Sequence, residues 1–170
     1  MVLITGGVKC GKSALAESIL EGAAKKVYLA TMVPYGEEAC AAIARHRSLR
    51  AGKGFETLEV YTDLMRAQVK DCSVLLECLG NLCANELFRE HPKTPEETAA
   101  YILEGIDYLR QQARSLVLVT CQVGADGLSY EAGTMDYIRV LGEVNRGAAQ
   151  MADTVAECVF GIPVLLKGTL

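Results

Sequence analysis

The sequence predicts an α/β fold, with a mainly parallel β-sheet and helices on both of its faces. Three observations carry this prediction. Short runs rich in Val, Leu and Ile alternate with longer segments of helical period, as in strands joined by crossover helices. These apolar runs are mostly continuous, which is typical of strands buried on both faces. A glycine-rich segment separates the first apolar run from the first helical segment.

The strands are expected where the apolar runs lie. The parallel ones are Val2–Thr5, Val27–Thr31, Thr57–Tyr61, Val74–Cys78 and Leu116–Thr120. A last pair, Val155–Phe160 and Val164–Leu166, is joined by Gly161-Ile162-Pro163. A parallel crossover needs about a dozen residues or more, so one C-terminal strand is predicted to be antiparallel.

Helices are expected at Lys12–Glu21, Glu37–Arg50, Pro95–Arg114 and Thr134–Met151. The third has a clear start signal, because Thr94 can cap it, Pro95 fits its first turn and Glu97 completes a capping box. The chain shows no linker, internal repeat or low-complexity tract. Residues 1–170 are therefore predicted to form a single domain.

The composition excludes several classes of protein. Of 170 residues, 51% are hydrophobic and 22% charged, and the net charge is −4. Lys and Arg are spread along the chain, whereas a general nucleic-acid binder usually carries a basic stripe. No apolar stretch approaches the roughly 18 residues of a membrane helix, and the N-terminal run is too short for a signal peptide. We expect no nucleic-acid partner, no membrane span and a cytoplasmic location.

The sequence contains seven cysteines, an odd number without a C-x-x-C pair. Most lie within apolar runs, where cysteine behaves as a small hydrophobic residue. This favours free thiols in a reducing compartment over a disulfide framework or a zinc site.

Residues 6–13 match the phosphate-loop pattern G-x-x-x-x-G-K-[ST]. The alternative interpretation is a chance glycine-rich turn. The flanking strand and helix are the context that the motif requires, and they favour the phosphate loop. Backbone N–H groups of such a loop, together with the helix N-terminus, bind phosphates; Lys12 would reach the β- and γ-phosphates, and Ser13 would ligate Mg²⁺. The predicted nucleotide contacts of this P-loop are Gly6, Gly7, Val8, Lys9, Cys10, Gly11, Lys12 and Ser13.

A P-loop enzyme needs a second carboxylate near the metal, usually at the tip of a buried strand. Glu77 follows three apolar residues in the run Val74-Leu75-Leu76. A carboxylate there is costly to bury unless a cation or hydrogen bonds compensate it. Glu77 is therefore predicted to serve the metal or the substrate hydroxyl. The alternative is that it ends a strand in solvent.

Two histidines are present, and they have different surroundings. His91 lies in a His-Pro-Lys loop and is read as a solvated loop residue. His46 stands among Arg45, Arg47 and Arg50, which indicate a bound anion, since Arg suits bidentate phosphate contacts. On a helix it would share a face with Ile43 and Leu49, so a packing role is the alternative.

Taken together, the motifs resemble those of the bifunctional adenosylcobinamide kinase/adenosylcobinamide-phosphate guanylyltransferase family of cobalamin assembly. The resemblance runs nearly from end to end. The matching segments are LITGG…GKS at 3–13, YLAT at 28–31, Arg45-His46-Arg47, Phe55–Glu59, VLLEC at 74–78, Asn85–Phe88, LVLVT at 116–120, Gly142-x-x-Asn145, Met151–Asp153 and Gly161–Pro163 with Lys167.

The resemblance implies a RecA-like P-loop fold, a homotrimer and a two-step transferase. The enzyme would phosphorylate adenosylcobinamide with ATP or GTP in the presence of Mg²⁺. It would then pass GMP from GTP through a guanylylated histidine to the new phosphate. That histidine falls on His46, and the family pattern with the P-loop chemistry makes His46, Lys12 and Glu77 the catalytic candidates. Beyond the P-loop, the implied nucleotide contacts are Ala30, Thr31, Met32, Arg47, Ser48, Leu49, Arg50, Glu59 and Glu77; Ser13 and Glu77 are the predicted metal ligands.

The chain departs from the family pattern in two places. The family commonly has Thr-Asn-Glu-Val-Gly where this chain has Thr120-Cys121-Gln122-Val123-Gly124, so a charge is lost at Gln122. An arginine-rich stretch is also replaced at 135–139. Two alternatives follow: a P-loop small-molecule kinase without a covalent intermediate, in which His46 is structural, and a catalytically weakened GTP-binding sensor or assembly protein.

Overall fold

A seven-stranded sheet with strand order β3-β2-β4-β5-β1-β6-β7 forms the centre of the molecule. The computed structural model describes residues 1–124 and 126–170, apart from the side chain of Leu49. Neighbouring strands from β3 to β6 are parallel, and β6 pairs with β7 in antiparallel orientation. The predicted fold class is confirmed, including the antiparallel C-terminal pair.

The strands lie close to the predicted runs. They are β1 (Val2–Thr5), β2 (Lys26–Ala30), β3 (Phe55–Glu59), β4 (Ser73–Glu77), β5 (Ser115–Val119), β6 (Thr154–Val159) and β7 (Ile162–Lys167). The largest shift concerns β3, which was expected at Thr57–Tyr61. It starts earlier because its register with β2 runs from Lys26 opposite Phe55 to Ala30 opposite Glu59.

The helices are α1 (Lys12–Ile19), α2 (Gly36–Arg50), α3 (Leu79–Leu87), α4 (Pro95–Gln112) and α5 (Ala132–Met151), with a short 3-10 turn η1 (Leu64–Arg66). The capping box at the start of α4 is present, since the Thr94 hydroxyl accepts from Glu97 N–H and the Glu97 carboxylate accepts from Thr94 N–H. Helix α3 was not predicted. It is short and largely buried, so its sequence lacks the polar stripe of a surface helix.

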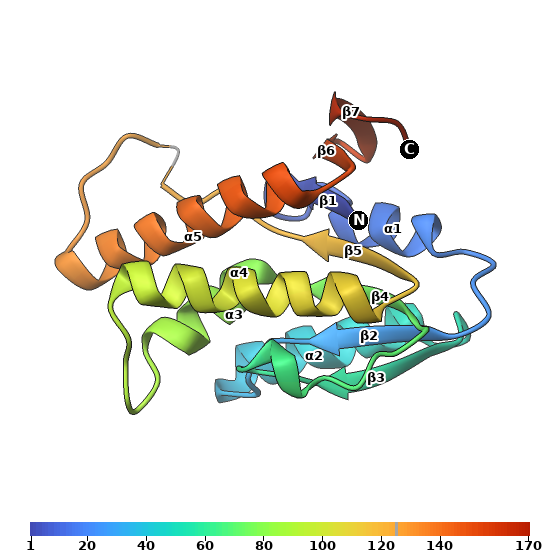
Figure 1. The fold of residues 1–170 in the computed structure, drawn as a ribbon, viewed down its shortest axis with the longest axis horizontal. Coiled ribbons are helices and arrows are strands. Elements are labelled where there is room, and N and C mark those ends of the chain that lie inside the picture. Colours follow the sequence, from blue (N-terminus) through green and yellow to red (C-terminus); the bar gives the residue numbers. More distant parts are fainter. Residues whose placement is uncertain (125) are drawn as a thin grey trace.

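Side chains alternate in direction along each strand and build two cores, one on each face of the sheet. Helices α4 and α5 lie side by side over one of these faces (Figure 1). One face packs against α3, α4 and α5, with Leu76 and Leu118 at its centre. The other packs against α1, with Leu75 and Val117 from the same strands. Helix α2 lies on this second face, and among its described side chains only Arg50 is buried.

The chemistry-bearing loops gather at one edge of the sheet. The segments that leave the carboxyl ends of β1, β2, β4 and β5 are the P-loop, the 31–35 connection, the start of α3 and the loop after Val119. In open α/β sheets ligands bind at this edge. Within the described residues, no helix combines the length and apolar character that crossing a membrane requires.

Candidate active site at the P-loop

The loop between β1 and α1 has the backbone that a phosphate cradle needs. Gly6 and Gly11 have φ angles of 141° and 104°, which side chains rarely tolerate. Gly6 also lies against β6, since a Cβ there would come 2.5 Å from the Cys158 carbonyl oxygen. The Gly161 N–H donates to the Cys10 carbonyl at 2.7 Å. The loop is thus held from the side of the β6–β7 turn.

The Lys12 side chain lies across its own loop. Its ammonium donates to the carbonyl oxygens of Gly6 at 2.9 Å and Gly7 at 2.5 Å. The ammonium therefore lies at the Gly6–Gly7 end of the loop, the segment that in a P-loop surrounds the bound phosphates. It is therefore placed to meet the phosphate oxygens of a bound nucleotide.

Ser13 and Glu77 are in direct contact, as their predicted shared role requires. The Ser13 hydroxyl donates to Glu77 Oε1. The Glu77 side chain is only 10% exposed, so it does not simply end a strand in solvent. A hydroxyl and a carboxylate side by side are hard oxygen donors of the kind that Mg²⁺ takes, usually together with phosphate oxygens and water. These residues fit a magnesium site.

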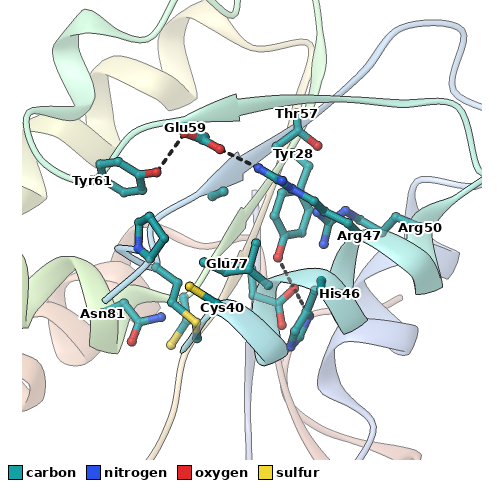
Figure 2. Close-up of a pocket in the computed structure, with 16 residues that line it drawn as sticks. Tyr28, Cys40, His46, Arg47, Arg50, Thr57, Glu59, Tyr61, Glu77 and Asn81 are labelled. Carbon is teal, nitrogen blue, oxygen red and sulfur yellow. Dashed lines mark hydrogen bonds and ion pairs between the residues drawn. The ribbon is translucent and has the colours of Figure 1, made fainter. Parts of the chain in front are cut away.

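His46 lies beside Glu77, near the carboxylate oxygen that Ser13 does not contact. Figure 2 shows the imidazole next to this acid. Its Nδ1 atom is 4.0 Å from Glu77 Oε2, and its side chain is 29% exposed. The imidazole is thus half-buried beside the acid, with its Nδ1 atom facing Glu77. This arrangement brings the predicted histidine and the predicted metal carboxylate together.

A cavity of about 330 Å³ opens beside His46 between α2 and the ends of β2, β3 and β4. Ala30, Met32, Arg47, Arg50 and Glu59, all predicted nucleotide contacts, line it. Arg47 Nη2 donates a hydrogen bond to Glu59 Oε1 at 2.6 Å, and the Tyr61 hydroxyl donates to Glu59 Oε2 at 2.8 Å. Burial, with this hydrogen bond next, raises the pKa of the Tyr61 hydroxyl.

Other predicted contacts are placed differently. The Thr31 side chain is fully buried, and its hydroxyl accepts from the Cys78 N–H at 2.7 Å, so it joins the ends of β2 and β4. Ser48 is exposed and is not among the residues that line the cavity. The side chain of Leu49 lies outside the described residues.

Tyr28, which sequence reasoning missed, lies at the centre of the site. Its hydroxyl donates to Glu77 Oε2 at 3.0 Å, and the Arg50 guanidinium carbon lies 3.3 Å from its ring centroid. Burial first, and the Glu77 charge second, raises the pKa of this hydroxyl far above its ordinary value, so it stays protonated. A tyrosine within the apolar run before the predicted Ala30–Met32 contacts was the available signal.

Asparagines that the sequence did not assign hold the loops of the site. Asn85 Nδ2 donates to the carbonyl oxygens of Thr31 and Tyr61, each at 2.8 Å. Asn145 Oδ1 accepts from the Thr120 hydroxyl at 2.6 Å, while its Nδ2 donates to the Cys121 carbonyl at 3.2 Å. These side chains fix the segments that follow β2, β3 and β5.

The departure from the family pattern at 120–124 lies on the loop after β5, whereas the one at 135–139 lies within α5. The Cys78 thiol and Cys121 form a hydrogen-bonded pair. This hydrogen bond, helped by the charge of Lys12 and opposed by burial, lowers the pKa of the Cys121 thiol to about 7. Gln122 Nε2 donates to Glu157 Oε1 at 3.3 Å, so a carboxylate from β6 stands beside the uncharged amide. Each of the seven cysteines is a free thiol.

The fold and the site define a P-loop nucleotide-binding protein. Solved structures of the same fold include a DnaB-like replicative helicase, with a TM-score of 0.51 and 10% identity over 92% of this chain and 46% of the helicase. A Pyrococcus horikoshii OT3 protein gives a TM-score of 0.51 and 7% identity over 100% of this chain and 87% of its own. These likenesses concern the fold, and the RecA-like prediction is confirmed.

Sequence comparison identifies the family. The family model described as "Cobinamide kinase / cobinamide phosphate guanyltransferase" matches residues 2–166. The bifunctional adenosylcobalamin biosynthesis protein CobU of Escherichia coli (strain K12) is 31% identical over 98% of this chain and 99% of its own length. Its counterpart CobP of Pseudomonas aeruginosa is 28% identical over 98% and 96%. The chain belongs to this family of transferases, as its motifs predicted.

Proposed function

We propose that residues 1–170 act as a single P-loop nucleotide-binding domain that phosphorylates adenosylcobinamide with an NTP. In a second step it transfers GMP from GTP, through a guanylylated His46, to adenosylcobinamide phosphate. The observation that carries this proposal is the double role of Glu77. One of its oxygens faces Ser13 at the P-loop and the other faces His46. The phosphate-binding and nucleotidyl-accepting parts of the site therefore meet at one carboxylate.

In the kinase step, the hydroxyl oxygen of adenosylcobinamide forms a bond to the γ-phosphorus as the bond to the β–γ bridging oxygen breaks. The hydroxyl proton is released, and the nucleoside diphosphate leaves. The loop N–H groups and Lys12 stabilise the charge on the phosphates. Mg²⁺, held by Ser13 and Glu77 when bound, would neutralise charge on the departing phosphate oxygens.

In the guanylyl step, an imidazole nitrogen of His46 attacks the α-phosphorus of GTP, and the bond to the α–β bridging oxygen breaks. Because Nδ1 faces Glu77, we assign the bond formation to Nε2. Pyrophosphate leaves from the P-loop. A phosphate oxygen of adenosylcobinamide phosphate then attacks the same phosphorus, the P–N bond breaks, and the imidazole is regenerated.

Arg47 and Arg50 supply positive charge near the reacting α-phosphate. Both line the cavity beside His46, and Nη1 of the buried Arg50 has no hydrogen-bond partner among the described residues. A buried guanidinium N–H without a partner is costly, which favours an anionic ligand at this point. The cavity between Ala30, Met32 and Glu59 would hold the guanosine.

The proposal includes a cytoplasmic homotrimer with a corrinoid as its substrate and no nucleic-acid partner. Ile162, Val164 and Leu165 on β7 are exposed in the single chain, which suits burial against a neighbouring subunit. Light scattering at several protein concentrations checks the oligomeric state, with a mass of about three times the 18.3 kDa chain expected.

Intact-protein mass spectrometry after incubation with Mg-GTP tests the covalent step. Wild type should gain one acid-labile GMP, and His46→Ala should gain none. His91→Ala, which alters the exposed loop histidine, is the matched control and should still carry the adduct. GTP binding without an adduct on wild type would favour a kinase without a covalent intermediate, or a sensor if phosphoryl transfer is absent too.

A further inference from the structure

Tyr28 is buried, and it contacts two charged groups of the site at once. Its hydroxyl donates to Glu77 Oε2 at 3.0 Å, and the centroid of its ring lies 3.3 Å from the Arg50 guanidinium carbon. Figure 2 shows the ring between the arginine of α2 and the acid of β4. The same side chain therefore touches the proposed metal carboxylate through its polar end and the proposed phosphate-binding cation through its apolar face.

The position of Tyr28 on β2 allows both contacts. Tyr28 pairs with Leu75 on β4, and Ala30 pairs with Glu77, so the ring starts two residues below the acid and reaches up toward it. Tyr28 and Leu75 belong to the core on the α1 face. This packing leaves the ring little freedom, so the hydroxyl reaches Glu77 from a fixed direction.

The two oxygens of Glu77 are divided between different partners. Oε1 accepts from Ser13, whereas Oε2 accepts from Tyr28 and faces His46 Nδ1 at 4.0 Å. A carboxylate held at both oxygens does not rotate freely. The Tyr28 hydroxyl therefore keeps Oε1 turned to the metal side and Oε2 turned to the imidazole.

Arg50 depends on the ring rather than on the hydroxyl. Its side chain is buried, and its Nη1 lacks a hydrogen-bond partner within the described part of the chain. A guanidinium stacked on an aromatic face keeps its N–H donors free at the edge of its plane. The ring of Tyr28 thus supports the cation while leaving donors for an anion.

We propose that Tyr28 is a positioning residue that sets two properties of the nucleotide site separately. Its hydroxyl orients Glu77 for Mg²⁺ and His46, and its ring holds Arg50 for a phosphate of the nucleotide. This inference rests on the proposed nucleotide chemistry of the site, which it extends by a residue that acts through its neighbours.

Two substitutions separate the two roles. Tyr28→Phe keeps the ring and removes the hydroxyl, whereas Tyr28→Leu removes both. Affinity for α,β-methylene-GTP, an analogue that does not release GMP, is measured by calorimetry across a series of Mg²⁺ concentrations. The rate of GMP transfer to the protein from GTP is measured in parallel. Tyr108→Phe, on α4 at the opposite face of the sheet, is the matched control for losing a tyrosine hydroxyl.

For Tyr28→Phe we expect analogue affinity without Mg²⁺ to stay within about two-fold of wild type. The half-saturating Mg²⁺ concentration should rise, and the GMP-transfer rate should fall, each by about ten-fold, as expected for a lost hydrogen bond to a charged group. Tyr28→Leu should in addition weaken the Mg²⁺-free affinity by about ten-fold, because Arg50 loses its support.

If Tyr28→Phe has the same Mg²⁺ dependence and GMP-transfer rate as wild type, the proposed role of the hydroxyl is overturned. This variant keeps the ring and its packing, so the result does not depend on a loss of folding. Equal loss of Mg²⁺-free affinity in both variants would overturn the division between hydroxyl and ring. A changed Mg²⁺ dependence in Tyr28→Phe, with no GMP adduct even on wild type, would refute the proposed covalent step and leave the positioning role intact.

Discussion

The Ser13 hydroxyl donates a hydrogen bond to Glu77 Oε1, so the last residue of the P-loop touches the last residue of β4. This contact reaches past β5, which lies between β1 and β4 in the sheet. The strands end at nearly the same level, since Ile4 and Glu77 both pair with Val119 of β5, and this brings two residues 64 positions apart into contact.

Glu77→Gln is expected to weaken Mg²⁺ use without abolishing nucleotide binding. The substitution keeps the shape of the side chain and its contact with Ser13 but removes the charge. The half-saturating Mg²⁺ concentration for GTP turnover should rise at least about ten-fold, as when partners of a metal site are lost. GTP affinity in EDTA should change little. An unchanged Mg²⁺ titration curve would exclude Glu77 from the metal site.

Gly6→Ala and Gly7→Ala should differ in stability, although they are neighbours in the P-loop. A Cβ on Gly6 would lie 2.5 Å from the Cys158 carbonyl oxygen, while one on Gly7 meets no described atom within 4 Å. We expect Gly6→Ala to lose about 1–3 kcal/mol of unfolding free energy and Gly7→Ala to stay within about 0.5 kcal/mol. Urea denaturation measures both, and equal losses would contradict the close packing of Gly6.

Alkylation of Cys121 should depend on pH in a way that reports its hydrogen bond with Cys78. Its pKa of about 7, against an ordinary 9.0, makes the thiolate dominant above neutral pH. The iodoacetamide rate at Cys121, followed by peptide mass spectrometry in a Cys40→Ser background, should rise with pH and reach its midpoint near pH 7. In Cys78→Ala the midpoint should move upward toward 9, because the donor is lost. A midpoint that stays in place would refute the role of the thiol pair.

Asn145→Ala should destabilise the loop that follows β5. Removing the amide leaves the Thr120 hydroxyl and the Cys121 carbonyl without their partner. We expect a loss of about 1–3 kcal/mol in unfolding free energy. Gln150→Ala, at an exposed position of the same helix, should change stability by less than about 0.5 kcal/mol. Similar losses of unfolding free energy in both variants would show that the substitutions destabilise the helix itself rather than the loop.

The sheet could be predicted because its strands are short, apolar and separated by glycines or helical segments. Leu75 and Leu76 point to opposite faces, and both faces are covered, so the run reads as continuously apolar. Helix α3 was missed for a related reason. Leu79, Leu82 and Cys83 follow the strand directly and are fully buried, which makes helix and strand hard to distinguish by period.

The site could be predicted where its residues are contiguous or end a strand. The P-loop and Glu77 are of this kind. Tyr28 was missed because its place in the site depends on contacts between separate elements. Its hydroxyl meets a residue 49 positions away, and Arg50 reaches its ring from α2. Thr31 is the opposite case. It was predicted as a nucleotide contact, but the sequence did not indicate that its side chain is buried between the ends of two strands.

The hydrogen bonds between the P-loop and the C-terminal β6–β7 segment have a consequence for when the chain can bind nucleotide during translation. The Cys10 carbonyl accepts from the Gly161 N–H and from the Cys158 thiol, which lies 148 positions later. At about 5–20 residues per second, the ribosome adds that partner roughly 7–30 s after Cys10. Until then the outer side of the cradle lacks its support. We therefore expect the nascent chain to capture nucleotide only after the β6–β7 turn has been added and has folded against the loop.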